Sequence, residues 1–236
     1  MVDIRTVAET ASTNEDMKAF VLDGAAEGTW LRAERQTGGR GRMGRRWEGE
    51  EGNFYASTLV RLSQRDPAAA TLAFVAAIAV HEVLIDFTGE GALTLKWPND
   101  IMAGQAKLCG MLLERVGDAV IIGIGINVAN APEIPGRQTA SLRRLGIDSA
   151  DPAVLLDLIA GCFAAWLHRW RSFGIEPVIK AWLARAHGRG TPLAVELPDG
   201  EVVRGQFETL DPGGALILRL ADGSRRAIHA GDVFLL

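Results

Sequence analysis

The chain has 236 residues, of which 48% are hydrophobic and 23% charged, and its formal net charge is −4. This is the composition of an ordinary soluble protein, and the length suits one large domain or a medium domain with a small one attached. The acidic balance excludes a general attraction for nucleic acid, so any anion-binding site must be local. The first ten residues lack the basic-then-apolar pattern of a secretory signal, and we expect a cytoplasmic protein.

The cysteines and the hydropathy of the chain exclude further classes of protein. Cys109 and Cys162 are far apart and belong to no Cys-x-x-Cys or Cys/His cluster, which argues against a zinc site or a disulfide framework. We expect Cys109 to pack in the core rather than to act as a nucleophile. The most apolar run, Pro67–Val80, is too short to span a bilayer and indicates a buried helix. We therefore expect no membrane association and no protein-bound metal.

The N-terminal part begins with a helix signal. Ser12 and Glu15 have the spacing of a capping box, and the helix is expected to stop at Gly24. A strand near Trp30–Arg35 leads into a loop rich in arginine and glycine. Strand-forming residues return at Asn53–Arg61.

A long alanine-rich helix is predicted next. Asp66 and Pro67 suit its N-cap and its first position, and it is expected to reach about Phe87. Three short strands joined by tight turns follow as an antiparallel meander, at Leu93–Trp97, Lys107–Arg115 and Ala119–Val128.

Two further helices precede a change of pattern. Asp151 and Pro152 open a helix that reaches about Phe173, and another helix is predicted at Pro177–Ala186.

The last residues, 191–236, hold about five short β segments separated by turn residues, as in a small barrel or sandwich. The predicted fold class is α+β, with a mixed, largely antiparallel sheet and flanking helices. We expect one domain at residues 1–187 and a small β-barrel domain at 188–236.

The stretch Gln36–Trp47, QTGGRGRMGRRW, joins a flexible backbone to planar donors that suit carboxylate and phosphate oxygens. Its pattern Gly39-x-Gly41-x-x-Gly44 matches a dinucleotide fingerprint, but a strand rather than a helix follows, which argues against a Rossmann site. Kinase and Walker motifs are absent from the sequence. A solvated basic loop is the alternative, and the density of glycine, which costs folding entropy, disfavours it.

Lys96 and Asn127 are further candidates, each with a plain structural alternative. Lys96 stands at a strand end before Pro98, which fixes the direction of its side chain, although an isolated strand lysine is more often solvated. Asn127 ends an apolar strand, where it either satisfies backbone groups or faces a ligand.

Six segments occur in a characteristic order and spacing: STN at Ser12–Asn14, QxxGRGRxGRxW at Gln36–Trp47, KWPND at Lys96–Asp100, KLCGMLLE at Lys107–Glu114, GIGINV at Gly123–Val128 and TASL at Thr139–Leu142. Together with the small terminal β domain, they resemble the biotin–protein ligases, the enzymes that attach biotin to carrier proteins. The resemblance covers essentially the whole chain.

The resemblance implies a catalytic domain with the fold of class II aminoacyl-tRNA synthetases and a C-terminal SH3-like barrel. It also implies an ATP-dependent reaction in two steps. Biotin and ATP give biotinyl-5′-AMP and pyrophosphate, and a lysine of a biotin carboxyl carrier protein then takes the biotinyl group. Because the chain begins at the catalytic region, it resembles the single-function ligases that lack a DNA-binding domain. A monomer or homodimer that binds neither nucleic acid nor membrane is expected.

Site residues follow from the same match. Biotin is expected to contact Ser12, Thr13, Asn14, Gln36, Gly41 and Arg42. The biotinyl-adenylate is expected beside Arg40 and Lys96, and the expected catalytic residues are Lys96, Arg42 and Arg40. The motifs add to the ligand-binding set Gly39, Arg45, Trp47, Gly110 and Asn127. The segment Ala129–Thr139 occupies the place of the family's adenylate-side loop.

This chemistry suits the residues present. A carboxylate that attacks the α-phosphorus of ATP needs positioning and neutralised charge rather than a protein nucleophile. Lys96 is a compact charge suited to bridging the two anions, and Arg40 and Arg42 supply forked donors. Mg²⁺ is expected to accompany ATP through phosphates and water. The glycine-rich loop is expected to be a lid that is poorly ordered until ligand binds and then keeps water from the anhydride.

Two other functions stay open. One is a lipoate or octanoyl ligase or transferase of the same fold, which the GRGRxGR loop and the lack of an activated cysteine disfavour. The other is a non-catalytic nucleic-acid-binding protein, which the acidic net charge disfavours.

Overall fold

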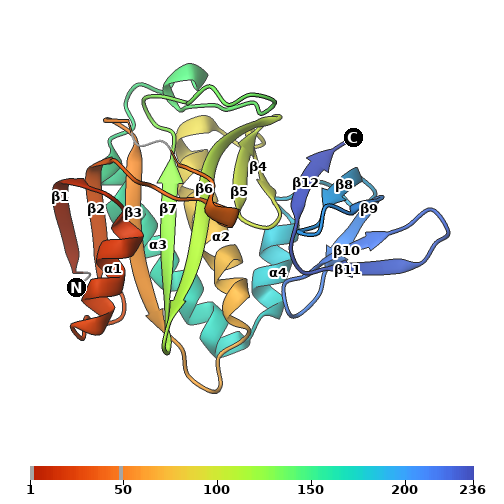
Figure 1. Cartoon of the computed structure of the whole chain (residues 1–236), viewed down its shortest axis with the longest axis horizontal. Helices are drawn as coiled ribbons and strands as arrows, with labels where there is room; N and C mark the ends of the chain where they lie inside the picture. The colour runs from red at the N-terminus through yellow and green to blue at the C-terminus, as the bar shows by residue number, and fades with distance from the viewer. Residues whose placement is uncertain (1–2, 48–49) are drawn as a thin grey trace.

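A seven-stranded sheet forms the larger part of the molecule (Figure 1), in a computed structural model that describes residues 3–47 and 50–236. Its strand order is β1-β2-β3-β7-β6-β5-β4; β1 and β2 run parallel, and every other neighbouring pair is antiparallel. The predicted mixed, largely antiparallel sheet is confirmed. The strands are β1 (Ile4–Thr10), β2 (Trp30–Gln36), β3 (Phe54–Arg61), β4 (Leu93–Lys96), β5 (Asp100–Ala103), β6 (Ala106–Val116) and β7 (Ala119–Ile126).

Helices cover the two faces of this sheet unequally. One face packs on α2 (Leu72–Thr88) and α3 (Pro152–Phe173), with α4 (Glu176–Leu183) beside them, whereas the short α1 (Thr13–Leu22) lies on the opposite face (Figure 1). Because side chains alternate along a strand, β7 serves both faces. The even-numbered residues from Val120 to Ile126 join the large core with α2 and α3.

The odd-numbered residues of β7 decide where a ligand can lie. Ala119 and Ile121 pack against α1, but the next two residues on that face are Gly123 and Gly125. Because a glycine has no side chain, the surface of the sheet is not filled by β7 side chains beyond the end of α1. This bare stretch is where the candidate site lies.

One predicted N-cap is wrong and another is confirmed. The helix expected at Pro67 begins at Leu72, after a 3₁₀ turn, because Asp66 does not cap it. The Asp66 carboxylate instead accepts a hydrogen bond from the backbone N–H of Ser63 and pairs with Arg171 of α3. In contrast, Asp151 caps α3 as predicted, through a 2.7 Å hydrogen bond from the backbone N–H of Ala153.

The capping box expected at the first helix is wrong in its side chains. Ser12 holds the N-cap position, but its hydroxyl makes no capping hydrogen bond and is buried on the site side of the helix. Glu15 pairs with Lys18 rather than returning to the N-cap backbone.

Two strands of the large sheet were not predicted: β5, within the meander, and β1, at the edge of the sheet. β5 contains only four residues and lies between the predicted strands Leu93–Trp97 and Lys107–Arg115. β1 is an edge strand with mostly exposed, polar residues and therefore no clear alternation of hydrophobic residues. Both strands exist because they pair with stronger neighbours, β6 and β2.

The C-terminal residues form a separate antiparallel sheet, which confirms the five predicted β segments. Its strand order is β11-β10-β9-β8-β12. Trp182 of α4 contacts Phe74 and Phe207 at ring-centroid distances of 5.4 and 6.5 Å, so this sheet shares a core with the helices. Its strands are β8 (Pro192–Glu196), β9 (Val202–Leu210), β10 (Leu216–Arg219), β11 (Arg225–Ile228) and β12 (Asp232–Leu235).

Two helical segments of the described chain, Ala69–Thr88 and Pro152–Phe173, are long and apolar enough to cross a membrane by length and composition. They pack against each other, and most of the first is buried in the core. Their hydropathy is therefore accounted for by packing inside the protein.

Candidate active site

A cavity of about 670 Å³ opens on the α1 face of the large sheet, between the loop 36–47, the middle strands and β12. It is lined by segments far apart in the sequence. Eleven of the residues expected at the ligand line it: Ser12, Thr13, Asn14, Gln36, Arg40, Gly41, Arg42, Arg45, Trp47, Lys96 and Gly110. The segment expected on the adenylate side reaches it too, with residues 133–139.

The other two expected residues, Gly39 and Asn127, lie outside the lining. A Cβ on Gly39 would stand 2.7 Å from the carbonyl oxygen of Trp47, so this glycine allows the loop to fold tightly on itself. The amide of Asn127 is buried and donates to the carbonyl of Ala140 at 3.0 Å. Asn127 therefore satisfies a backbone group in this structure, and its contact with a ligand stays a prediction.

One end of the cavity is a buried polar network. The side-chain oxygen of Gln36 accepts hydrogen bonds from both the backbone N–H and the hydroxyl of Thr13, at 2.8 and 3.0 Å. Ser57 of β3 lies 2.7 Å from the hydroxyl of Thr13 and 2.7 Å from Oδ1 of Asn14. Several donors and acceptors thus converge where the first turn of α1 meets the sheet.

The floor of the cavity is made of glycine backbone. A Cβ on Gly125 would meet the indole of Trp47 at 2.6 Å, and one on Gly110 would meet that ring at 3.0 Å and Lys107 Nζ at 2.9 Å. Trp47 therefore lies flat on the sheet. Its Nε1 is buried and has no hydrogen-bond partner among the residues that the structure describes.

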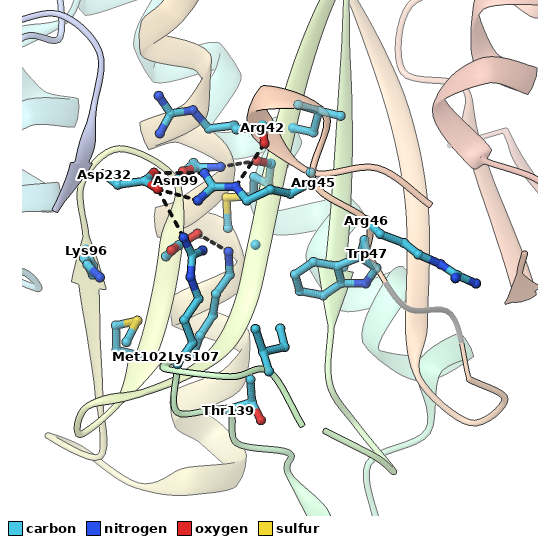
Figure 2. A pocket seen from close by; sticks show the side chains of 18 of the residues that line it. Arg42, Arg45, Arg46, Trp47, Lys96, Asn99, Met102, Lys107, Thr139 and Asp232 are labelled. Carbon is cyan, nitrogen blue, oxygen red and sulfur yellow. Dashed lines mark hydrogen bonds and ion pairs between the residues drawn. The ribbon is translucent and has the colours of Figure 1, made fainter. Parts of the chain in front are cut away.

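The opposite end gathers positive charge. Lys96 at the end of β4 and Lys107 of β6 extend from neighbouring parts of the sheet toward the cavity (Figure 2). Lys107 Nζ lies 2.6 Å from Oδ1 of Asp100 and 5.4 Å from the centre of the Trp47 ring. Burial lowers the pKa of Lys96 from its ordinary value, and the Asp100 carboxylate opposes that shift. Both lysines are placed to neutralise an anion.

The arginine–glycine loop is folded across the cavity. Its backbone makes a turn in which Gly41 N–H donates to the carbonyl of Arg45 at 2.7 Å and Trp47 N–H donates to that of Gly39 at 2.9 Å. Met43, at the tip, has a positive φ of 56° and an exposed side chain. Disorder of the loop in the ligand-free protein stays a prediction.

The C-terminal strand β12 holds this loop through Asp232 (Figure 2). Arg45 makes two contacts with its carboxylate, one of them 2.9 Å between Nη2 and Oδ1, and Arg137 adds a third at 3.2 Å. Arg42 donates to the carbonyl of Gly231 at 3.3 Å. Hydrogen bonds from Arg45 hold the pKa of Asp232 below its ordinary value. Burial, the largest influence on Arg42, lowers the pKa of its guanidinium.

Several residues that shape the cavity were not predicted as site residues. Lys107, Gly123 and Gly125 lay inside matching motifs, so a signal for them was present. Ser57 stood in an ordinary strand sequence, and Asp232 is the first residue of β12, near the chain end; only the tertiary fold brings either to the site.

The structure shows neither a reactive environment for Cys109 nor, among the described residues, a cluster of metal-ligating side chains. Cys109 is completely buried, and burial raises the pKa of its thiol, so it is core packing as expected. Across residues 3–47 and 50–236, no group of three or more His, Cys, Asp or Glu side chains has the arrangement of a metal site.

Comparison with known proteins agrees with this geometry. Residues 8–127 match the biotin/lipoate A/B protein ligase family, and residues 191–236 match the biotin protein ligase C-terminal domain. The biotin–[acetyl-CoA-carboxylase] ligase of Paracoccus denitrificans is 37% identical, over 97% of this chain and 98% of the relative. That of Mycobacterium tuberculosis is 34% identical, over 96% and 86%.

A solved structure extends the similarity to three dimensions. The biotin protein ligase from Aquifex aeolicus, in complex with biotin and ATP, superposes with a TM-score of 0.86 at 27% identity and covers 100% of this chain and 99% of its own. The similarity therefore spans both sheets and the cavity between them. This chain belongs to the biotin protein ligases.

Proposed function

We propose that this protein activates biotin with ATP as biotinyl-5′-AMP and transfers the biotinyl group to a lysine of a biotin carboxyl carrier protein of a carboxylase. The observation that carries the proposal is the polarity of the cavity. Buried hydrogen-bonding groups at one end, a glycine and tryptophan floor, and a basic opposite end suit the urea ring, the apolar chain and the carboxylate of biotin. The curated ligases named above support the same reaction.

The balance of charge along the cavity supports adenylation. Among the residues that the structure describes, the cavity is lined by three acidic side chains, Asp100, Glu133 and Asp232, and by seven basic ones: Arg40, Arg42, Arg45, Arg46, Lys96, Lys107 and Arg137. A carboxylate and a triphosphate repel each other, so the excess of cations lowers the cost of bringing them together. We assign to Lys96 the bridging of the biotin carboxylate and the α-phosphate, with Lys107 as a second point charge and the arginines on the phosphates.

Transfer requires the mixed anhydride to survive until the acceptor amine arrives. The loop 36–47 covers the cavity and is fastened to β12, which supports its role as a barrier to water. The neutral amine of the acceptor lysine attacks the acyl carbon, an amide forms, and AMP leaves with the bonding electrons. No protein nucleophile takes part in this scheme.

Mg²⁺ is assigned to the nucleotide rather than to a protein cage. Asp100 stands opposite Lys96 in the pairing of β4 with β5 and lies 2.6 Å from Lys107 Nζ, so it shares the basic end with both lysines. Since the described residues hold no cluster of ligating groups, phosphate oxygens and water would supply most ligands. When bound there, Mg²⁺ would offset the negative charge of the leaving pyrophosphate.

We also infer the finer architecture from the family. The large sheet with its helices, residues 1–187, is assigned to the fold of class II aminoacyl-tRNA synthetases. The sheet β8–β12, in residues 188–236, is assigned to an SH3-like barrel. The five antiparallel strands of the second sheet support this assignment.

Incubation of the protein with ATP, Mg²⁺ and biotin tests the proposal, with pyrophosphate release and biotinyl-5′-AMP as readouts. Lipoate in place of biotin tests the one rival that the matching family model leaves open, since its description includes lipoate ligases. We expect adenylate with biotin and none with lipoate; the reverse result would assign the protein to lipoate.

A further inference from the structure

A charged pair outside the cavity is connected to the polar end by one hydrogen bond. Lys18 of α1 lies with its Nζ 2.7 Å from Oε1 of Glu114, on β6. The other carboxylate oxygen of Glu114 accepts a 2.7 Å hydrogen bond from Nδ2 of Asn14. Asn14 itself is buried and lines the cavity, whereas Glu114 and Lys18 stand behind it and are partly exposed. The carboxylate therefore acts on the cavity through the asparagine.

This contact fixes which end of the Asn14 amide faces the ligand. A carboxylate only accepts hydrogen bonds, so the amino group of Asn14 must point toward Glu114. Oδ1 then lies next to Ser57 and against the backbone of Gly123, where a Cβ would lie only 2.3 Å from it, and Gly123 lines the cavity. Without Glu114, the amide has no group that distinguishes its two orientations.

The ionised carboxylate of Glu114 maintains this orientation of the Asn14 amide. Burial alone raises the pKa of its carboxyl, but the hydrogen bonds from Lys18 and Asn14 and the charge of Lys18 outweigh burial and leave the pKa lowered. Arg40, from the loop above, adds a further positive charge. At neutral pH the carboxylate is therefore an acceptor and not a donor.

The remaining network leaves the oxygen of Asn14 able to accept from a ligand. Gln36 accepts both hydrogen bonds from Thr13, so the Thr13 hydroxyl uses its proton there and has lone pairs for Ser57. Ser57 has one proton and two acceptors within 2.7 Å. At most one lone pair of Asn14 Oδ1 is occupied by Ser57, and the other can receive a proton from an N–H group.

We propose that Glu114, supported by Lys18, is a positioning residue that presents Asn14 Oδ1 as the acceptor for an N–H group of the cyclic urea of biotin. The inference rests on the proposed function and adds the residue that sets the polarity of the urea end. It makes the site selective for a ligand that donates at this point. Glu114 and Lys18 contact Asn14 and each other, and the ligand contacts only Asn14.

An exchange of donor and acceptor between positions 14 and 114 tests the proposal. Asn14→Asp alone sets two carboxylates against each other, and Glu114→Met alone leaves the amide unoriented. The double variant Asn14→Asp with Glu114→Gln restores one donor facing one acceptor, with an oxygen still presented to the cavity. Glu15→Gln is the matched control, because it removes the other carboxylate that contacts Lys18 and leaves Asn14 untouched.

Calorimetric binding of biotin to each purified protein, with melting curves to confirm folding, gives the readout. Each of Asn14→Asp and Glu114→Met is expected to weaken biotin binding roughly 10- to 100-fold, the effect of losing a hydrogen bond to a charged group. The double variant is expected to recover to within about fivefold of wild type, and Glu15→Gln to stay within about twofold. The KM for ATP is expected to change little in any of them.

Two results would overturn the inference. One is biotin binding by Glu114→Met within twofold of wild type, and the other is a folded double variant that binds no better than Asn14→Asp. Failure of the proposed function has a different signature, because wild-type protein would then neither bind biotin nor form biotinyl-adenylate.

Discussion

Arg45 and Asp232 are 187 positions apart in the sequence, yet the guanidinium of one contacts both carboxylate oxygens of the other. The pair joins the loop that covers the cavity to the last strand of the C-terminal sheet. Arg137, from the segment after β7, contacts the same carboxylate. One acidic side chain of the second sheet therefore contacts both of these segments, which border the ligand site.

Replacement of Asp232 by asparagine is expected to loosen the loop. The amide accepts fewer hydrogen bonds and has no charge, and for a partly exposed pair the loss is about 1 kcal/mol or less. Amide hydrogen exchange of residues 38–46 should then become up to about fivefold faster. Glu201→Gln, which breaks the exposed pair with Arg226 far from the loop, is the control. Unchanged exchange in Asp232→Asn would show that the pair does not order the loop.

Arg42 is the loop residue whose removal should separate the two half-reactions. Its side chain is largely buried over the cavity and bonded to the carbonyl of Gly231, so glycine at this position opens the cover. Arg42→Gly is expected to form biotinyl-adenylate and to release it. Labelling of serum albumin, a protein without a carrier domain, measures the release. Selective labelling of the carrier by this variant would contradict the role of the loop as a lid.

Lys96 should be required for the first step. Removing one preorganised charge at a developing transition state typically lowers the rate by about 100- to 1000-fold, and Lys96→Ala is expected to reduce pyrophosphate release by that amount. Lys180→Ala, an exposed lysine of α4, is the control and should behave as wild type. Normal adenylation by a folded Lys96→Ala protein would remove Lys96 from the mechanism.

The pH dependence of the same step follows from the environment of Lys96. Burial lowers the pKa of this lysine, and its charged form is the active one, so activity is present below that pKa and is lost as the pH rises through it. The alkaline limb of kcat/KM for biotin should therefore lie below 10.5, the ordinary lysine value. Lys96→Arg should lower the rate but move this limb to higher pH. An alkaline limb common to both proteins would belong to another group.

Gly123 should be intolerant of even one methyl group. A Cβ there would stand 2.3 Å from Oδ1 of Asn14, so Gly123→Ala must displace the asparagine. We expect biotin binding at least about tenfold weaker, since a shifted hydrogen bond in a buried site costs about 1–3 kcal/mol. Gly161→Ala in α3 meets nothing within 4 Å and should leave binding unchanged while raising helix stability slightly. Calorimetry and thermal melting distinguish the two.

The motifs of the sequence predicted where the site lies better than how it is built. Ser12–Asn14, Gln36, Lys96 and Gly110 were expected at the ligand, and the fold brings all of them to one cavity. Those residues belong to local patterns that a chemical need explains. Their partners were not predicted: Ser57 lies in no motif, and Glu114 ends the motif KLCGMLLE without an expected role. Both acquire their roles from the pairing of the strands and the packing of α1 on the sheet.

The secondary structure also separates features set by local sequence from features set by tertiary contacts. Asp151 capped its helix as predicted, because an aspartate before a proline is a strong local signal. Asp66 carried the same signal and did not cap, since Arg171 and a tight turn at Ser63 took its carboxylate. Tertiary competition of this kind cannot be seen from neighbours in the chain.

This protein is expected to make biotinyl-adenylate and to transfer its biotinyl group to a carrier lysine. Purified protein with ATP, Mg²⁺, biotin and a biotin carboxyl carrier domain tests it most directly, followed by mass spectrometry of the nucleotides and of the carrier. We expect pyrophosphate, biotinyl-5′-AMP in the absence of carrier, and one biotinyl group on one carrier lysine in its presence. Absence of the adenylate from a folded, biotin-saturated protein would contradict it.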